Sequence, residues 1–284
     1  MKVFLIIVLF CFYKNICIAQ IYSGQITDAK GFHPISYANI GIIGKNIGTT
    51  SDEDGHFKIE LSSEFDNDTI CISCIGYKSK KYLIKNFKQG TNNVNEIRIE
   101  LLPRTFLLPE IVIESIKTTM HLLGNLCDSS STYGNAFYSK QLGTEIGVLI
   151  KLPKKTTKAY LKNFRFYVGE FTLGSFPVRL NIYNLKNGLP YENILKEPIL
   201  LEIKSTGENI IDLNEKNIIV ENDFFISLEY YRIADKADGK LIFCAVHPKS
   251  IKQGNGFYRL TSHGYWIPEY NDNIGFSVQI ECEY

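Results

Sequence analysis

The feature that most constrains the fold is a short alternation of apolar and polar residues that returns many times along the chain. The run from Val94 to Leu101 is the clearest case, because its apolar residues recur at nearly every second position. A period of two places successive side chains on opposite faces of a β-strand, so each run can bury one face. About seven such runs, separated by glycine and polar turn residues, lie between Ile21 and Leu101, and this spacing predicts a β-sandwich.

The segment from Gly48 to Phe57 is a polar stretch between two of these runs. Its two glycines supply the backbone freedom of tight turns, and Asp52 and Asp54 can bond the amides that follow them. A calcium loop would use similar residues. However, counting Thr50 as its first position places Leu61 at the twelfth, where a bidentate glutamate is required. We therefore expect a structural turn between two strands.

Four sequence blocks follow one another in this region, namely Gly24–Asp28, Pro34–Ile40, Gly48–Phe57 and Ser73–Tyr77. Together they resemble the carboxypeptidase regulatory-like domain, and the likeness covers Gln20 to about Leu102. The resemblance implies a seven-stranded sandwich of the transthyretin, or prealbumin, type. It also implies a non-catalytic module of the kind appended to peptidases and found at the front of TonB-dependent outer-membrane receptors. We assign residues 20–115 to this domain.

The segment from Glu110 to Glu114 resembles, over five or six residues, the element with which such receptors engage a periplasmic energy-coupling protein. We favour an extra strand or an extended linker, which also explains its β-branched residues. A receptor also needs a plug and a membrane barrel, and fewer than about 180 residues follow this point. We expect no transporter, and we predict a linker over residues 116–132 with a short helix at Lys117–Leu126.

Strand-like runs resume after the linker and continue to the last residue, so residues 133–284 are predicted to form a second, jelly-roll-like β-sandwich of around ten strands. The fold class is therefore all-β throughout. Within the run from Pro177 to Leu185, the alternation places three apolar side chains on one face of the strand. It places Arg179, Asn181 and Tyr183 on the other.

The N-terminal segment, Met1 to Ala19, has the pattern of a cleaved signal peptide: a lysine at position 2, an apolar core and small residues at the cleavage site. Its apolar run is shorter than the ~20 residues that span a bilayer, so no membrane span is expected after cleavage. We expect an exported protein that is periplasmic, associated with the outer membrane, or secreted. The formal charge of +1 gives no general attraction to nucleic acid.

Five cysteines lie beyond the signal peptide, and this odd number argues against a fully paired disulfide framework. Cys71 and Cys74 have the spacing of half a zinc site or a redox pair. The residues around them predict a strand, however, and positions three apart on a strand point to opposite faces. We therefore expect two small buried residues, with no metal or cofactor bound.

No nucleophile elbow, zinc-protease pair or phosphate loop occurs in the sequence, so we predict a non-enzymatic protein without catalytic residues. The first domain is expected to serve docking or assembly, and the second to bind an unidentified protein or glycan of the cell envelope. A carbohydrate-binding protein is the alternative, with Tyr265, Trp266 and Tyr270 as candidate ligand-binding residues, although packing also explains them. A hydrolase with a dispersed site is the third hypothesis.

Overall fold

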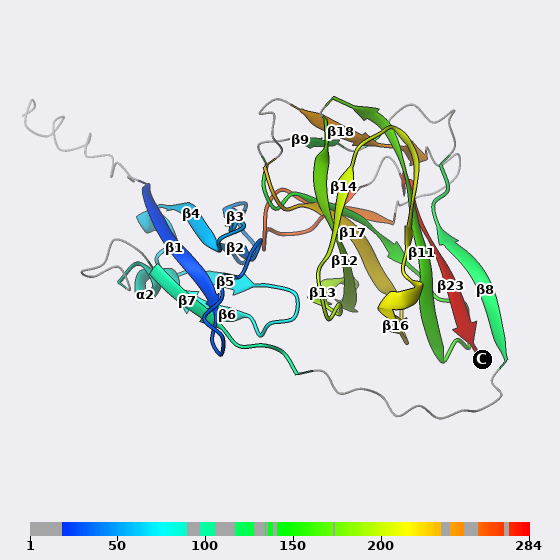
Figure 1. The fold of residues 1–284 in the computed structure, drawn as a ribbon, viewed down its shortest axis with the longest axis horizontal. Helices are drawn as coiled ribbons and strands as arrows, with labels where there is room; N and C mark the ends of the chain where they lie inside the picture. Colours follow the sequence, from blue (N-terminus) through cyan, green and yellow to red (C-terminus); the bar gives the residue numbers. More distant parts are fainter. Residues whose placement is uncertain are drawn as a thin grey trace, which may run out of the picture.

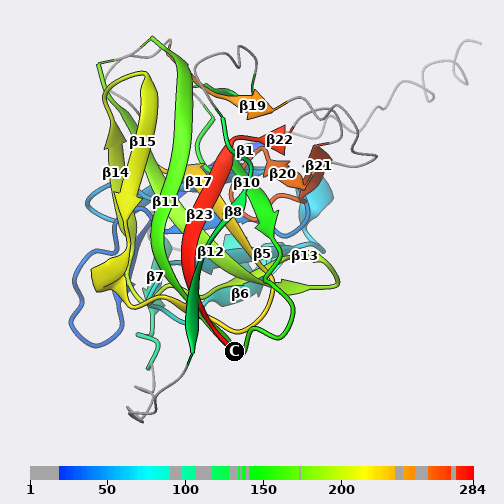
Figure 2. The same cartoon turned by 90° about the vertical axis from the view of Figure 1, so that its right-hand side faces the viewer.

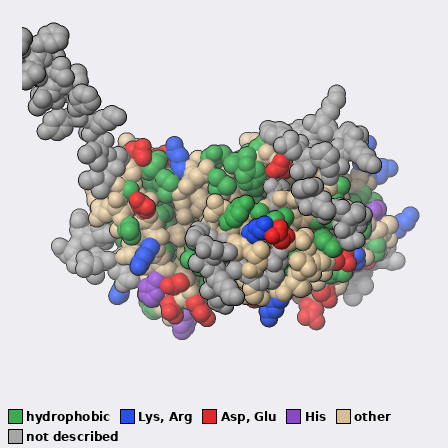
Figure 3. Space-filling view, turned by 90° about the horizontal axis from the view of Figure 1, so that it is seen from above, with side chains coloured by type: hydrophobic (Ala, Val, Ile, Leu, Met, Phe, Trp, Pro, Cys, Tyr) green, Lys and Arg blue, Asp and Glu red, His purple; other side chains and the backbone are tan. Residues whose placement is uncertain are grey.

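The computed structural model describes residues 19–89, 97–105, 117–127, 134, 136–138, 141–172, 174–233, 239–246, 255–269 and 273–284. The predictions for residues 1–18 of the signal peptide, for Glu110–Glu114 and for Tyr270 lie outside these ranges. Figure 1 shows two lobes, one holding β1 to β7 and the other holding β8 to β23. Acidic and basic side chains are interspersed over the face seen in Figure 3.

The first lobe is a sandwich of two sheets, as the sequence predicts. One sheet has the order β4-β1-β7 and the other the order β3-β2-β5-β6. Its elements are β1 (Gln20–Asp28), β2 (Asn39–Ile42), β3 (Gly48–Thr50), β4 (His56–Leu61), η1 (Ser63–Phe65), β5 (Thr69–Ser73), β6 (Lys80–Leu83), α2 (Ile84–Gln89) and β7 (Ile97–Leu101). Alternation produces the core directly, because β4 and β7 bury every second side chain.

The turn predicted near Asp52 joins β3 to β4. The Asp52 Oδ1 atom accepts hydrogen bonds from the amides of Asp54 at 3.0 Å and His56 at 2.8 Å. Gly55 has a positive φ of 76°, and a Cβ atom there would lie 2.6 Å from the carbonyl oxygen of Ile26. The segment is therefore a side-chain-stabilised turn, closed at a position that requires glycine.

The second lobe is also a sandwich. One sheet has the order β13-β12-β17-β10-β20-β21, with β14 also paired to β12, and the other has the order β8-β23-β11-β18-β9, with β15 and β16 paired to β11. Figure 2 shows β8, β23 and β11 side by side. The elements are β8 (Thr118–Gly124), β9 (Ala136–Tyr138), β10 (Glu145–Ile150), β11 (Lys158–Phe171), β12 (Phe176–Lys186), β13 (Leu189–Asn193), β14 (Ile199–Ile203), β15 (Gly207–Asp212), η2 (Asn214–Lys216), β16 (Ile219–Val220), β17 (Phe224–Tyr230), β18 (Lys240–Phe243), β19 (Ala245–Val246), β20 (Gly256–Arg259), β21 (Ile267–Glu269), β22 (Asn273–Ile274) and β23 (Phe276–Glu283).

The helix predicted at residues 117–126 is wrong, because Thr118–Gly124 form strand β8. This strand pairs antiparallel with β23 from Thr118 opposite Glu283 to Gly124 opposite Ser277. A leucine- and methionine-containing segment fits a helix by local propensity, but the free edge of β23 offers it a complete ladder of hydrogen bonds. The predicted linker region thus contributes a strand to the second sandwich.

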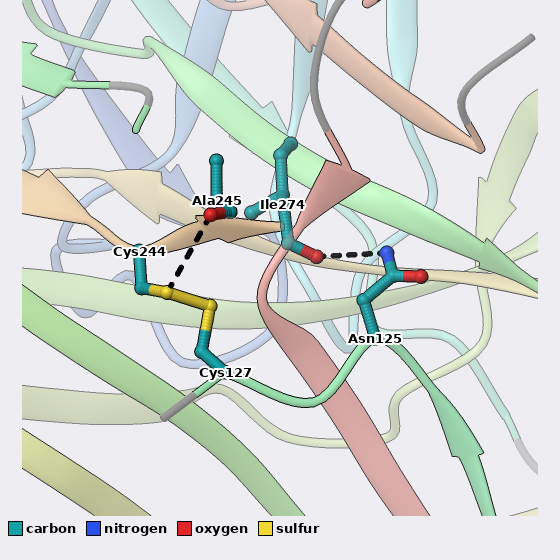
Figure 4. Close-up of a disulfide and its surroundings, with 5 residues drawn as sticks. All are labelled: Asn125, Cys127, Cys244, Ala245 and Ile274. Atoms are coloured by element: carbon teal, nitrogen blue, oxygen red, sulfur yellow. Dashed lines mark hydrogen bonds between the residues drawn. A yellow bond between two sulfur atoms is a disulfide. The ribbon is translucent and has the colours of Figure 1, made fainter. Parts of the chain in front are cut away.

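A disulfide joins Cys127, just beyond β8, to Cys244 between β18 and β19 (Figure 4). The two Cα atoms are 6.2 Å apart. Close by, the Asn125 side-chain amide donates to the carbonyl oxygen of Ile274 at 2.8 Å. Cys71, Cys74 and Cys282 are free; Cys71 is buried as predicted, whereas Cys74 is half-buried. The disulfide therefore fastens the segment after the first strand of the second sandwich to the link between β18 and β19, 117 residues further along the chain.

None of the helices among the described residues is long and apolar enough to cross a membrane.

Candidate functional site

Strand β12 presents a polar face away from the core of the second sandwich. Val178, Leu180 and Ile182 belong to the hydrophobic core, while Arg179 and Asn181 between them belong to the buried polar residues. This confirms the facing predicted from the alternation. The strand lies inside its sheet rather than at an edge, since it pairs with β17 on one side and with β13 and β14 on the other.

The strand register places four charged residues in one row across this polar face. Arg179 on β12 lies opposite Glu229 on β17, Glu229 lies opposite Glu145 on β10, and Glu145 lies opposite Arg259 on β20. The order of charge along the row is therefore plus, minus, minus, plus. All four side chains are at most 7% exposed, and the two glutamates are at 0%. We call these four residues the charged row.

Each carboxylate of the charged row is paired with its neighbouring arginine. The Nη2 atom of Arg179 lies 2.8 Å from Glu229 Oε2, and its Nε atom lies 3.2 Å from the same oxygen. On the other side, the Nη2 atom of Arg259 lies 2.5 Å from Glu145 Oε2. Buried charges need such partners, because an unpaired charge in the interior is costly.

Asn181 and Ser227 connect the two carboxylates from the next row of the sheet. The side-chain amide of Asn181 donates to Glu145 Oε1 at 2.9 Å and to Glu229 Oε2 at 2.8 Å. The Ser227 hydroxyl donates to Glu145 Oε1 at 2.5 Å. The two negative charges are thus held side by side by shared donors, and the cluster acts as one hydrogen-bonded network.

The two glutamates differ in their electrostatics. Burial raises the pKa of Glu145, and the attraction of Arg259 only partly opposes it. Burial acts on Glu229 as well, but the charges of Arg179 and Arg259 outweigh it and lower the pKa of that carboxyl. Paired acids with separated pKa values occur in acid–base catalysis, although buried ion pairs with a structural role produce the same separation. In this arrangement the protein encloses both carboxyl groups.

Arg179 extends the network into the first lobe. Its Nη1 atom donates to the carbonyl oxygen of Tyr37 at 2.7 Å, and its Nη2 atom donates to Asn39 Oδ1 at 2.7 Å. Tyr37 also stacks edge-to-face on Tyr231, with ring centroids 4.7 Å apart. The first lobe therefore covers the polar face of β12. This explains why polar residues are buried at positions where the alternation would otherwise place them in solvent.

The loop between β20 and β21 forms the second part of this contact. The carbonyl oxygen of His263 accepts a hydrogen bond from the amide of Gly44 at 3.0 Å. The His263 Nε2 atom lies 3.1 Å from the Ser73 hydroxyl, and the ring is half-buried. Burial, reinforced by the charge of Arg259, lowers the pKa of His263 from 6.5 to about 3. The imidazole is therefore neutral where the two lobes meet.

The close approach of the lobes depends on glycine at two positions of the β2–β3 hairpin. A Cβ atom on Gly41 would lie 2.1 Å from the carbonyl oxygen of Ser262, and one on Gly48 would lie 2.6 Å from the same oxygen. Both distances are far shorter than any real contact of a Cβ atom. Backbone therefore meets backbone here, and any side chain at Gly41 would force the lobes apart.

An open cleft of about 530 Å³ lies beside the charged row, between the two lobes. The first lobe contributes Lys78, Lys81 and Arg104, together with smaller polar groups. The second lobe contributes Arg179, Asn181, Tyr183, Tyr191, Glu192, Asn193, Arg259 and His263. The arrangement can bind a small polar molecule, because the cleft has the size of a ligand pocket and an excess of hydrogen-bonding groups.

The structure places the candidate ligand-binding residues predicted from the sequence in different environments. Trp266 packs edge-to-face on Phe225, with ring centroids 5.0 Å apart, and the guanidinium of Arg259 lies 4.8 Å from the centre of its ring. Tyr265 is 50% exposed and its hydroxyl accepts a hydrogen bond from Asn46. Tyr270 lies outside the described residues. Trp266 thus packs on the edge of the charged row.

Sequence reasoning missed Glu145, Glu229 and Arg259 of the charged row. Glu229 does stand at a polar position of an alternating strand, two residues after Ser227, and this pattern was visible. In an isolated sandwich such positions face solvent. Only the docking of the first lobe converts them into a buried network, and single-chain alternation carries no information about that docking.

The comparisons with known proteins identify the first lobe. Residues 22–113 match the family model described as CarboxypepD_reg-like domain. The first lobe is therefore a carboxypeptidase regulatory-like domain, as its four sequence blocks indicate. No curated protein matches the chain.

The solved structures that resemble this chain include two of Cwp84. The cysteine protease and lectin-like domains of Cwp84, a surface layer associated protein of Clostridium difficile, align with 8% identity over 50% of this chain and 32% of that chain, with a TM-score of 0.36. A structure of the clostridial cysteine protease Cwp84 after propeptide cleavage aligns with 8% identity over 94% of this chain and 71% of that chain, with a TM-score of 0.39. This chain spans about a third of the first structure. These similarities are too low to carry a functional argument.

Proposed function

We propose that this chain is an exported, non-enzymatic protein of the cell envelope, in which the regulatory-like domain serves as a docking module and the second sandwich binds a partner. The observation that carries the proposal is the contact between Arg179 and the regulatory-like domain. A buried guanidinium that bonds both Tyr37 and Asn39 fits a domain that is held in one position.

Two features support export. Met1–Ala19 has the pattern of a signal peptide, and Cys127 and Cys244 form a disulfide, which persists in oxidising compartments. An envelope location also agrees with the occurrence of regulatory-like domains at the front of outer-membrane receptors.

The charged row supports a non-enzymatic role. Glu145 and Glu229 are fully buried, and each is bonded to an arginine and to Asn181. A catalytic acid or base must reach the substrate directly or through one water molecule. Carboxyl groups enclosed in this way are better suited to fix the two domains than to transfer protons.

The proposal is tested by expressing the full chain in a Gram-negative cell, separating its compartments and sequencing the N-terminus of the mature protein. We expect the protein outside the cytoplasm, beginning at Gln20. An uncleaved cytoplasmic protein would contradict export. Separately, hydrolysis of a chromogenic glycoside or ester by the purified protein that disappears in both Glu145→Gln and Glu229→Gln would contradict the non-enzymatic role.

Carbohydrate binding by the loop that holds Tyr265 and Trp266 is the second candidate. It is favoured by the 50% exposure of Tyr265 next to a partly exposed tryptophan, since aromatic rings are the usual platform for sugars. A glycan array with the wild-type protein and Tyr265→Ala tests it. Carbohydrate binding at this loop requires that the wild-type protein bind at least one glycan and that Tyr265→Ala lose this signal. An array on which the wild-type protein gives no signal rejects it.

A further inference from the structure

We propose that the cleft between the two domains is a binding site for an anionic saccharide, a hydroxyl-rich ring that carries a carboxylate or a phosphate. Its volume of about 530 Å³ lies within the range of small-molecule pockets. Both domains contribute to its wall, so the inference rests on the docked arrangement that underlies the proposed function. Tyr265 and Trp266 are not part of this wall.

The charge of the cleft favours an anion. Lys78 and Lys81 line it from the regulatory-like domain, are both exposed, and form no ion pair with any residue that the structure describes. Arg104 also lines the cleft, 3.9 Å from Glu192, and both of these side chains are about half exposed. The buried arginines of the floor are already balanced by the two glutamates of the charged row. The two lysines therefore leave a net positive rim above a neutral floor.

One buried donor of a residue that lines the cleft has no partner among the described residues. Arg259 lines the cleft and is 7% exposed, and its Nε atom is buried without a hydrogen-bond partner among the described residues. Its Nη2 atom is held by Glu145, which fixes the plane of the guanidinium. A buried donor without an acceptor is costly, so an oxygen atom that reaches it from the cleft would be bound favourably.

The remaining groups favour a saccharide over a simple inorganic anion. Asn39, Ser73, Ser79 and Asn193 line the cleft with amide and hydroxyl groups, which both donate and accept hydrogen bonds, as sugar hydroxyls require. Asn39, Ser73 and Asn193 already bond protein groups, so they offer a ligand their remaining donor and acceptor sites. Tyr191 lines it with a ring that is 54% exposed; the Lys186 ammonium lies 4.6 Å from the centre of this ring on one face, which leaves the other face for a ligand. Lysines alone would suffice for an inorganic ion, whereas this mixture matches a polyhydroxylated ring.

The test is isothermal titration of the mature full-length protein with D-glucuronate, D-glucose 6-phosphate, D-glucose and inorganic phosphate, each up to about 10 mM at low salt. The double variant Lys78→Gln, Lys81→Gln is compared with Lys151→Gln, Lys204→Gln, which removes two exposed lysines that do not line the cleft. Heat denaturation of every variant, followed by circular dichroism, checks that it is folded.

We expect binding of glucuronate or glucose 6-phosphate, weakened about tenfold or more in the cleft variant and unchanged in the control variant. Which of the two binds identifies the anionic group. Glucose binding as tightly as either charged sugar, phosphate binding as tightly, no binding by any probe, or equal binding by both lysine variants would each overturn the proposal. X-ray scattering on the same samples reports whether the domains are docked, so a failure of this site is distinguished from a failure of docking.

Discussion

Arg179 of the second sandwich donates a hydrogen bond to the backbone carbonyl oxygen of Tyr37 of the regulatory-like domain, over 2.7 Å. The same guanidinium neutralises Glu229, which is itself fully buried. One side chain thus belongs both to the charged row and to the domain contact. The stability of the second sandwich and the position of the first domain are therefore coupled through this arginine.

Replacing Arg179 with methionine should be strongly destabilising. The variant leaves the Glu229 carboxylate buried without its closest cation and leaves acceptors of the regulatory-like domain unpaired, a loss of about 3–5 kcal/mol. Urea denaturation followed by circular dichroism measures it. The matched control is Lys216→Gln, which breaks the exposed pair with Glu197 and should cost at most about 1 kcal/mol. Equal effects of the two variants would show that the charged row contributes little.

His263 should make stability depend on pH. Its pKa is lowered in the folded protein, so the unfolded chain binds more protons below pH 6.5, and stability falls as pH falls from 6.5 towards about 3. Glu229, Arg259 and Lys81 are the charged groups that act on the ring. Asparagine suits the positive φ of 60° at this position, so His263→Asn is the comparison.

The difference in unfolding free energy between wild type and His263→Asn should shrink as the pH is lowered from 7 to 5, because only the wild type loses the histidine contribution. Taking the difference cancels the contributions of Glu145 and Glu229, which both proteins share. Urea denaturation at each pH measures it. A difference that is constant over this range would mean that His263 titrates normally in the folded state.

Removing the disulfide should weaken the second sandwich. The double variant Cys127→Ala, Cys244→Ala is expected to lose about 2–5 kcal/mol, because the bond constrains a long segment of the unfolded chain. Dithiothreitol should destabilise the wild type to a similar extent and leave the double variant unaffected. Cys282→Ala, which removes a free thiol and keeps the disulfide, is the control, and dithiothreitol should destabilise it as much as the wild type. A wild type that is insensitive to reductant would argue against the disulfide.

Trp266 should matter for stability, whatever it binds. Its ring packs on Phe225, Tyr183 and the guanidinium of Arg259, so Trp266→Ala should cost about 2–3 kcal/mol, while Tyr265→Ala on the exposed side should cost less than about 1 kcal/mol. Denaturation followed by circular dichroism compares the two variants. Equal small losses would indicate that Trp266 is free to serve as a ligand platform.

Much of the fold follows from local pattern. Alternation predicts β4, β7 and the facing of Arg179 on β12, because these depend on neighbours along one strand. The turn at Asp52 follows from its glycines and from aspartates that bond the amides after them. Strand β8 was missed because its conformation is decided by pairing with β23, about 160 residues away in sequence.

The charged row is harder to predict from the sequence than these elements. Glu145, Arg179, Glu229 and Arg259 come from four separate strands and become neighbours only through the register of the sheet. Their burial depends in turn on Gly41 and Gly48, whose missing side chains let a second domain approach. Neither relationship leaves a periodic signal in a single chain.

The most direct test of the docked arrangement is small-angle X-ray scattering of the mature protein beside Gly41→Val and Gly169→Val. A Cβ atom at Gly41 would clash with Ser262, whereas at the exposed Gly169 of β11 its nearest neighbour is 3.9 Å away. We predict a compact wild type and a compact Gly169→Val, with a radius of gyration of about 18 Å, and a clearly larger value for Gly41→Val. A wild type as extended as Gly41→Val, or a Gly41→Val that stays as compact as the wild type, would contradict the docking of the regulatory-like domain on the charged row.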